Sequence, residues 1–410
     1  MLHPINPQGS LYKILNKVPF ILQIIIGMIA GIILAAIIPH DPLVLPTLGT
    51  LFVSALKAIA PLLVFVLVSA SIARQDKGSK TNMKPIICIY FASMVLSSLV
   101  ALIMATTFPS TFNTLANAAT NATPKGISEV LLNFIRQAVD NPINALITGN
   151  YIGILVWGIA FGLLFRVSKP ATKEVLGDLA STVSGVVRIV IRFAPLGVMG
   201  LVYSSCTQEG GFYNLLNYLH VVLVLVSTML IIAFIVNPLI VFAVTRKNPY
   251  PLVFTSITQS AITAFFTRSS AANIPVNLSL CEKLGVPRET YTISIPLGCT
   301  INMAGAAVTI VVMTMAAVNT LGIHVDFASA LLMCIASVLC ACGTSGIAGG
   351  SLMLIPLSCS IFGISNDIAM QVVGIGFIIG VIQDSTETAL NSSSDVVFTA
   401  AACGITKVKD

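Results

Sequence analysis

Long runs of apolar residues alternate with short polar connections along most of this chain. A transmembrane helix needs about 20 consecutive, mostly apolar residues, and several runs reach that length. The apolar runs lie at about residues 18–38, 48–73, 85–108, 130–165, 183–203 and 218–244. Together with the segments after residue 250, they predict an all-α polytopic membrane protein with about eight transmembrane helices.

Polar and glycine-rich motifs interrupt the segments that follow. TRSSAANIP (267–275) divides residues 252–280, and ACGTSGIAGGS (341–351) divides residues 328–364. Each flank is too short to span a membrane, which is the pattern of a re-entrant helical hairpin. Between them, GCTINMAG (298–305) indicates a helix broken in mid-membrane. Two successive units of hairpin and span predict the internal repeat of a secondary transporter, whereas the alternative, glycine-rich surface linkers, would not need apolar flanks.

The last apolar segment contains VIQDSTETALNSSSDVVFTAAAC (381–403), in which three acids lie among hydroxyl and amide side chains. In a helix, positions 3, 4, 7 and 11 after a reference residue share one face. Counted from the first acid, this face carries Asp384, Glu387, Thr388, Asn391 and Asp395. Because a carboxylate that faces lipid is costly, we expect this stripe to face a cavity, a partner charge or an ion. The alternative is a buried polar seam that only holds helices together.

Composition supports the membrane assignment and changes the meaning of the net charge. Hydrophobic residues make up 56% of the 410 residues, charged residues only 9%, and the mean hydropathy is +0.97, which excludes a soluble globular chain. The net charge of +6 comes mostly from short loops, and basic loops alternate with basic-poor ones. This alternation predicts a multi-pass topology with cytoplasmic N- and C-termini rather than nucleic-acid binding.

The chemistry of these segments favours a site for a zwitterion and a sodium ion. Carboxylate oxygens and the free carbonyls of a broken helix suit a hard monovalent cation, and a carboxylate also suits a substrate ammonium group. Hydroxyl and N–H donors at a hairpin tip suit a substrate carboxylate, especially beside a helix N-terminus. We expect no catalysis, because Asp384 and Asp395 lie roughly 16 Å apart along the helix, too far for a protease dyad. We expect no cofactor other than sodium as coupling ion.

These motifs resemble those of the dicarboxylate/amino acid:cation symporter family over nearly the whole chain. RSSAANIP, TINMAG, GTSGIAGGS and QDSTETALNSSSD follow one another in the family's order of two hairpins and two final spans. Within the family, the chain is most similar to bacterial members that carry serine and threonine with sodium. The resemblance implies a glutamate-transporter-like inverted-repeat fold, an elevator-type alternating-access mechanism and a homotrimer in the bacterial inner membrane.

The resemblance also implies roles for individual positions. The implied substrate-binding residues are Arg268, Ser269, Ser270, Ile347, Ala348, Gly349, Asp384, Glu387, Thr388 and Asn391. Among them, Asp384 would take the amino group, Ser270 and Asn391 would hold the α-carboxylate, and residues 347–349 would close as a gate. Two sodium sites are implied, one formed by Asp395 with carbonyls of Gly298, Asn302 and Asn391, the other by Thr300 with carbonyls of Ala341, Cys342 and Thr344.

A division of the chain follows from the same resemblance. Residues 11–83 and 110–213 would form a scaffold, the second part with an external loop. Residues 84–109 and 214–410 would form a transport region that contains both hairpins and the substrate site.

Two departures from the family pattern bear on specificity and coupling. Glu387 stands where members that carry acidic substrates have an arginine. Because like charges repel strongly in a low-dielectric pocket, this acid favours a small neutral substrate with a hydroxyl group. Ala304 and Ala306 replace the aspartate and threonine of the family's NMDGT motif, and Met94 replaces another ligand of the same site. We therefore expect coupling to fewer sodium ions than in glutamate transporters.

Arg268, at the first hairpin tip, has three interpretations. It neutralises Glu387 in a buried pair that serves structure, or that pair keeps Glu387 ionised and shapes a neutral pocket. In the third, Arg268 itself binds an acidic side chain, which would make the protein a sodium- or proton-coupled carrier of acidic amino acids or dicarboxylates.

Overall fold

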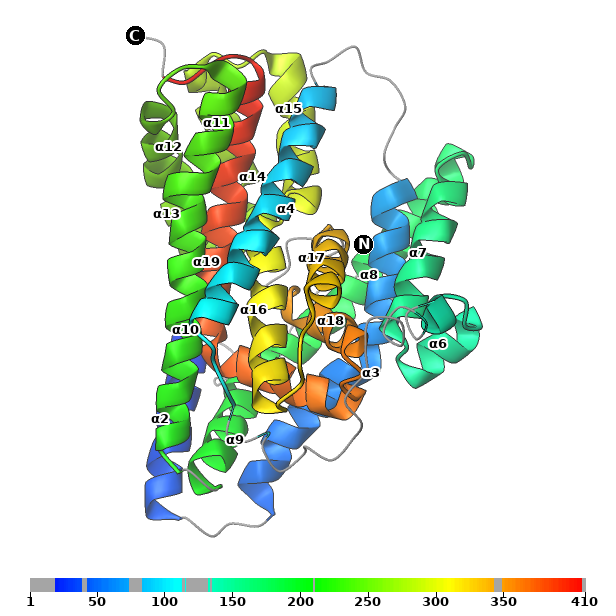
Figure 1. Ribbon diagram of the computed structural model, residues 1–410, viewed down its shortest axis with the longest axis vertical. Helices are drawn as coiled ribbons and strands as arrows, with labels where there is room; N and C mark the ends of the chain where they lie inside the picture. The colour runs from blue at the N-terminus through cyan, green and yellow to red at the C-terminus, as the bar shows by residue number, and fades with distance from the viewer. Residues whose placement is uncertain are drawn as a thin grey trace, which may run out of the picture.

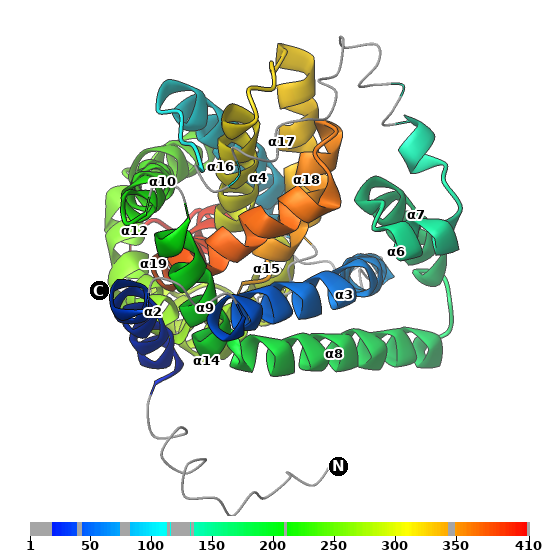
Figure 2. The ribbon, with the colours of Figure 1, turned by 90° about the horizontal axis from the view of Figure 1, so that it is seen from below.

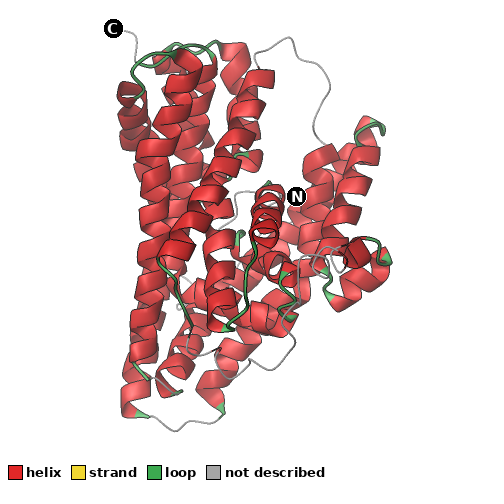
Figure 3. Cartoon of the chain, viewed as in Figure 1, coloured by secondary structure: helices red, strands yellow, loops and turns green. Residues whose placement is uncertain are grey.

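The computed structural model describes residues 19–38, 43–73, 83–112, 115, 132, 135–208, 211–342 and 349–407. Within these ranges the chain consists of helices joined by short loops and turns, and no strand occurs (Figures 1 and 3). The predicted all-α class is therefore confirmed. Most of the predicted external loop, at about residues 110–128, lies outside the described residues.

The helices largely follow the apolar runs of the sequence. In chain order they are α2 (Phe20–Ile37), α3 (Val44–Ala73), α4 (Met83–Thr107), α6 (Pro142–Thr148), α7 (Tyr151–Phe165), α8 (Pro170–Arg192), α9 (Ala194–Thr207), α10 (Tyr213–Ile231), α11 (Asn237–Thr245), α12 (Tyr250–Ser256), α13 (Ile262–Thr267), α14 (Ser270–Leu284), α15 (Arg288–Ile301), α16 (Ala304–Thr320), α17 (Phe327–Ala341), α18 (Ile355–Ile361) and α19 (Asn366–Ala402). The π-helical turns η2 (Ile232–Val236) and η3 (Ile257–Ala261) join α10 to α11 and α12 to α13, and the 3₁₀ turn η4 (Leu352–Leu354) precedes α18.

Five helical segments in the described part of the chain are long and apolar enough to cross a membrane, or six if the bent pair α8–α9 is one span. The five are α3, α4, α10–α11, α15–α16 and α19. The predicted total of about eight also counts α2 and α7, two shorter apolar helices. A helix satisfies its backbone hydrogen bonds internally, so such segments can lie in lipid.

The run predicted as one span at residues 183–203 is not a continuous helix. α8 ends at Arg192, α9 begins at Ala194, and the two helices are bent by 53°. Pro195 in the first turn of α9 has no N–H to donate, and its ring would clash with the preceding turn of a continuous helix. The run is apolar throughout this region, so hydropathy alone did not reveal the break.

The interrupted segments after residue 250 have the predicted breaks. α13 ends at Thr267 and α14 begins at Ser270, and these two helices pack together as the first hairpin. α15 and α16 are separated at Asn302 and Met303, whose backbone angles are not helical. In the second hairpin α17 packs against α18, and residues 343–348 between them lie outside the described residues.

Two groups of helices make up the described structure. α19 lies within the first group and contacts α10, α13, α14, α15, α16 and α18 (Figure 1). Every residue of 304–318 in α16 is buried, as expected for a helix that is apolar on all sides. In the second group, α3 contacts α7, α8 and α9, and α2 packs on α9; Figure 2 shows α3 running alongside α8.

Glycines allow a close crossing between α3 and α9. A Cβ atom at Gly200 would lie 2.5 Å from the backbone nitrogen of Gly49 and 2.5 Å from the carbonyl oxygen of Leu45. Small residues are common where membrane helices approach backbone to backbone, because packing rather than water exclusion holds such helices together. This crossing therefore depends on the absence of side chains at these two glycines.

Candidate functional site

The polar stripe of α19 faces the interior of the protein. Its five members are buried, with exposed fractions of 2% for Asp384, 6% for Glu387, 6% for Thr388, 3% for Asn391 and 1% for Asp395. On another face of the same helix, Ile382 is 48% exposed. The prediction that this stripe faces away from lipid is confirmed, and its neighbours are the hairpins and the broken helix.

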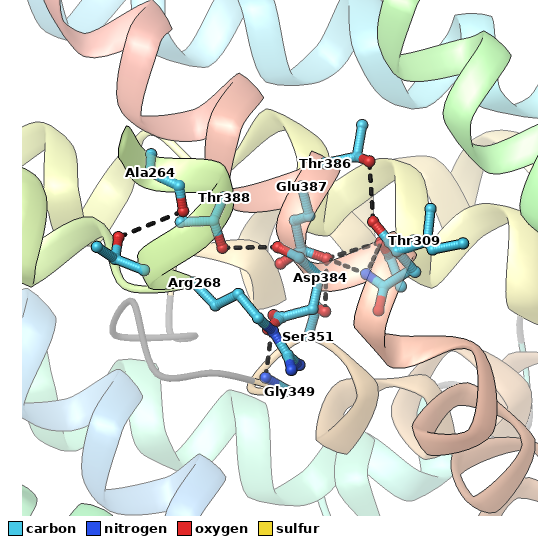
Figure 4. Close-up of polar contacts among 12 residues, drawn as sticks. Ala264, Arg268, Thr309, Gly349, Ser351, Asp384, Thr386, Glu387 and Thr388 are labelled. Atoms are coloured by element: carbon cyan, nitrogen blue, oxygen red, sulfur yellow. Dashed lines mark hydrogen bonds and ion pairs between the residues drawn. The ribbon is translucent and has the colours of Figure 1, made fainter. Parts of the chain in front are cut away.

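Asp384 connects the tips of the two hairpins (Figure 4). Arg268 of the first hairpin donates from Nε to Asp384 Oδ2 at 2.7 Å, and both side chains are buried. The backbone N–H of Gly349, in the second hairpin, donates to Asp384 Oδ1 at 3.1 Å. Two of the three interpretations of Arg268 pair it with Glu387, but the structure pairs it with Asp384, one helical turn before Glu387. Other groups hold the Glu387 carboxylate. The third interpretation, that Arg268 binds a substrate carboxylate, stays a prediction.

The first hairpin tip has a backbone that presents Arg268 to this site. Arg268 adopts the left-handed conformation, with φ of 51°, and ends α13. A non-glycine residue in that conformation costs roughly 1–2 kcal/mol. Ser269 then caps α14, because its Oγ accepts a hydrogen bond from Ala272 N. Ser270, at the first position of α14, is buried.

A polar seam holds the first hairpin against α19. Asn273 and Asn277 of α14 both donate from Nδ2 to the hydroxyl of Ser392, at 2.9 and 3.1 Å. Asn277 also donates to the carbonyl oxygen of Ser392 at 2.9 Å, and Ser260 donates to Asn277 Oδ1 at 2.6 Å. These hydrogen bonds form a buried polar seam beside the acidic stripe. The seam joins the first hairpin to α19.

Three donors converge on one oxygen of Glu387. Thr309 Oγ1 of α16 and Ser351 Oγ of the second hairpin each donate to Oε2 at 2.7 Å, and Gln383 Nε2 donates to it at 2.6 Å. None of these three donors was predicted from the sequence. Gln383 could have been found, since it lies four residues before Glu387 on the same helix face. Thr309 and Ser351 come from other elements, and nothing in their spacing pointed to Glu387.

The two uncharged members of the stripe, Thr388 and Asn391, have partners in the helices. Asn391 Oδ1 accepts a hydrogen bond from Gly305 N at 2.7 Å, which ties α19 to the start of α16. Its Nδ2 donates to the sulfur of Met303 at 3.4 Å. Thr388 donates to the carbonyl oxygen of Asp384 at 2.7 Å, a local bond within the helix. The predicted roles of Asn391 and Thr388 toward substrate stay predictions.

Asp395 lies beside the break between α15 and α16. Asn302 donates from Nδ2 to Asp395 Oδ1 at 2.9 Å, and Asn302 Oδ1 is buried with no hydrogen-bond partner among the described residues. A Cβ atom at Gly298 would lie only 2.4 Å from Asp395 Oδ1. Three of the four members predicted for the first sodium site, Gly298, Asn302 and Asp395, are therefore together. Asn391, the fourth, is one helical turn from Asp395.

Part of the second predicted sodium set also comes together. Cys342, at the end of α17, donates from Sγ to the carbonyl oxygen of Ile301 at 3.6 Å, next to Thr300. Ala341 is buried, whereas the Cys342 carbonyl accepts a hydrogen bond from Ser71 of α3 at 3.4 Å. Thr344, with Ile347 and Ala348 of the predicted gate, lies outside the described residues, and Gly349 is the gate residue that contacts Asp384.

The arrangement is suited to binding and release of charged small molecules. Two hairpin tips and a broken helix meet a charged face of one transmembrane helix, which is the construction of a secondary transporter. In the described ranges, no group of three or more His, Cys, Asp or Glu side chains could hold a metal ion as a resident cofactor.

The sequence profile of the sodium:dicarboxylate symporter family matches residues 20–404. The chain therefore belongs to this family. It is a membrane-embedded symporter of the dicarboxylate and amino acid class, a transporter and not an enzyme, and sodium fits as its coupling ion. This confirms the resemblance drawn from the four motifs.

Proposed function

We propose that this symporter imports serine and threonine together with sodium. The observation that carries the proposal is Glu387, a second buried carboxylate one helical turn from Asp384. Among its described residues the site contains one arginine, Arg268, which pairs with Asp384. With all three groups ionised, one negative charge is in excess, and this charge attracts an ammonium group and repels a side-chain carboxylate.

In this proposal the substrate lies between the two hairpin tips. Its ammonium group binds Asp384, which then shares its two oxygens between substrate and Arg268. Its α-carboxylate binds the first hairpin, where Ser270 and the start of α14 offer a hydroxyl group and a helix N-terminus. Asn391 and Thr388 complete the contacts, and residues 347–349 close over the substrate.

Sodium is a second substrate in the proposed cycle. Asp395 with the Gly298, Asn302 and Asn391 carbonyls would form one site, and Thr300 with the Ala341, Cys342 and Thr344 carbonyls the other. Such sets of oxygen ligands suit a hard cation. The proximity of Gly298 to Asp395 supports the first set, and the Cys342 contact with Ile301 supports the second.

In the proposed mechanism, the part of the protein that contains the substrate site moves across the membrane relative to a fixed scaffold. Residues 84–109 and 214–410 would travel as a transport region, and residues 11–83 and 110–213 would stay as a scaffold in a homotrimer. The contacts within each of the two helix groups support this division. The proposed location is the bacterial inner membrane, with both termini cytoplasmic.

Uptake of labelled serine into liposomes that contain the purified protein tests the proposal. We expect uptake under an inward sodium gradient, competition by threonine, and little competition by aspartate. Replacement of sodium by choline should reduce uptake to the level of protein-free liposomes. Equal uptake in sodium and choline would reject the coupling.

One observation favours a second candidate, a carrier of acidic amino acids. Arg268 Nη1 is buried and has no hydrogen-bond partner among the described residues, so the guanidinium could also bind a side-chain carboxylate. This candidate requires that aspartate competes with labelled serine better than unlabelled serine does. The same liposome assay therefore separates the two functions.

A further inference from the structure

The membrane span formed by α10 and α11 ends in two adjacent basic residues. The span runs from Tyr213 to Thr245, and Arg246 and Lys247 follow it directly, both exposed. Because the end of a span lies at the level of the lipid head groups, these two cations lie at the membrane surface. Figure 1 shows this end of α11 beside α12.

Arg246 has a free guanidinium group in an unusual backbone position. Among the described residues, none forms an ion pair or hydrogen bond with this side chain. Arg246 ends α11 in the left-handed conformation, with φ of 57°, where helices usually have glycine. An arginine is unfavourable at such a position, so helix termination does not explain its presence. Its charge is available to a ligand.

Lys247 adds a second positive charge and is anchored to another helix. Its Nζ donates to the carbonyl oxygen of Gly404, just after α19, at 3.0 Å. Its backbone N–H donates to Thr245 Oγ1 at 3.2 Å, which holds the turn after α11. An ammonium group has three donors, so Lys247 can contact an anion while it keeps its bond to Gly404.

An aromatic surface extends along the helices from these two cations into the membrane. Tyr250 and Phe254 of α12 are 44% and 52% exposed, with ring centroids 6.0 Å apart, and Phe234 of η2 packs on Phe254, also at 6.0 Å. The Tyr250 hydroxyl donates to the Phe234 carbonyl oxygen at 3.4 Å, which joins α12 to η2. Phe234 lies 12 residues before Arg246, about 18 Å along a helix. This length is close to half of the hydrocarbon core of about 30 Å.

We propose that Arg246 and Lys247 bind the head group of an anionic phospholipid, whose acyl chains cover the surface of Tyr250, Phe254 and Phe234. Adjacent basic side chains at a membrane surface attract anionic lipids, and a guanidinium group matches the geometry of a phosphate. A soluble phosphate would contact the cations only, whereas a phospholipid also covers the aromatic surface below them. This lipid site is independent of the proposed substrate.

Thermal unfolding of the purified protein in detergent tests the lipid site. Most of the nine cysteines are buried, so a thiol-reactive fluorophore reports unfolding. We expect added dioleoylphosphatidylglycerol, which is anionic, to raise the unfolding temperature by about 2–4 °C more than zwitterionic dioleoylphosphatidylcholine does. Inorganic phosphate added with phosphatidylcholine should give no such rise. An equal effect of the two lipids, or an equal rise with phosphate, would overturn the proposal.

The Arg246→Gly variant tests the residue itself. Glycine suits the left-handed conformation, so in phosphatidylcholine this variant should unfold at or above the temperature of the unmodified protein. We expect phosphatidylglycerol to produce less than half of the original rise. Arg246→Asn is the second variant, because asparagine also tolerates this conformation, and it should show the same loss. A full rise in both variants would refute the assignment.

Lys283→Gln is the matched control. Lys283 is exposed near the end of α14, beside Glu282 and at the same end of the molecule as Arg246 (Figure 1). The substitution removes one positive charge, as Arg246→Gly does, and should keep the full effect of phosphatidylglycerol. An equal loss in Lys283→Gln and Arg246→Gly would contradict a site at Arg246, because net charge alone would then account for the lipid effect.

Discussion

At the scale of single residues, a glycine decides how closely the broken helix approaches α19. A Cβ atom at Gly298 would lie 2.4 Å from Asp395 Oδ1 and 2.8 Å from the hydroxyl oxygen of Tyr90. Real Cβ atoms do not come so close to other heavy atoms, so any side chain here must displace Asp395 or separate the helices. The sequence marked Gly298 as part of a motif, but its neighbours became known only from the fold.

We predict that Gly298→Ala weakens sodium binding. The added methyl group displaces the Asp395 carboxylate, so the sodium concentration for half-maximal serine uptake should rise about tenfold or more. Overpacking should also lower the free energy of unfolding by roughly 1–3 kcal/mol. Sodium titration of uptake and thermal unfolding in detergent measure the two effects.

Gly380→Ala is the matched control in α19, because a Cβ atom there meets no atom of the described residues within 4 Å. Alanine in an open helical position is neutral or stabilises by up to about 1 kcal/mol. An unchanged sodium dependence in Gly298→Ala would contradict the proposed first sodium site.

A second prediction at this scale concerns Asp384. Asp384→Asn should abolish serine uptake, because the substrate ammonium loses its counter-charge and Arg268 is left as an uncompensated buried cation. Removing one partner of a buried ion pair lowers the free energy of unfolding by about 3–5 kcal/mol, so the unfolding temperature should fall. The protein should still elute as a folded species. Uptake and size-exclusion chromatography measure the two expectations.

The control for this substitution is Asp367→Asn, at the start of the same helix. The Asp367 side chain is 78% exposed and pairs with Lys57, and exposed pairs contribute only about 0–1 kcal/mol. We expect transport close to normal in this variant. Normal serine uptake by Asp384→Asn would show that the amino-group assignment is wrong.

At the scale of elements, the sequence was most informative where a period repeats over several turns. The stripe on α19 recurs over about three turns, so the helix face followed from spacing alone. The break at Phe193 was missed because apolar residues continue on both sides of it. The partner of Arg268 could not be predicted from the sequence, because Asp384 and Glu387 lie within one helical turn of each other. Only the packing of the hairpins against α19 decides which of the two acids Arg268 contacts.

The second hairpin begins with α17, and the N-terminus of this helix leads to a prediction at the scale of elements. Asp326 caps α17, with Oδ1 accepting from Ser329 N at 3.0 Å and Oδ2 from Ser329 Oγ at 2.6 Å. Asp326→Ala should lower the free energy of unfolding by about 0.5–2 kcal/mol through the loss of this cap. Asp326→Asn should retain most of the stability, because asparagine caps helices as well as aspartate does. Thermal unfolding of both variants measures the difference, and equal losses in both would contradict the capping role.

This cap also has a predicted pH dependence. The hydrogen bond from Ser329 is the main cause that lowers the pKa of Asp326 below its ordinary value of 3.8. A group with a lowered folded-state pKa stabilises the fold above its unfolded pKa and loses this effect as the pH falls through the folded value. The stability gap between the unmodified protein and Asp326→Ala should therefore be constant near pH 7 and shrink below about pH 4.

At the scale of the whole molecule, an ion pair joins the two proposed bodies. Lys57 of α3, in the proposed scaffold, contacts Asp367 at the start of α19, in the proposed transport region. Both side chains are exposed, at 41% and 78%, so the pair contributes about 0–1 kcal/mol and can break at little cost. Such a contact is compatible with a relative movement of the two bodies.

We predict that a covalent link at this position stops transport. With the nine native cysteines replaced, the pair Lys57→Cys and Asp367→Cys should form an oxidised cross-link that blocks serine uptake, and a reductant should restore it. The matched control is Asp140→Cys with Asn150→Cys, two residues that contact each other within the proposed scaffold. That link should leave uptake unchanged. Full transport by the cross-linked 57–367 protein would reject the proposed movement.

The sequence by itself determined the membrane class, the interrupted segments and the acidic face of the last helix. Each of these follows from local physics, namely the length of apolar run that lipid requires, the cost of exposed backbone in lipid, and the helical period. Only the tertiary structure decided that Arg268 pairs with Asp384, that three donors hold Glu387 Oε2, and that Gly298 touches Asp395. These contacts join segments far apart in the chain, and which atoms meet depends on how helices pack rather than on any spacing along the sequence.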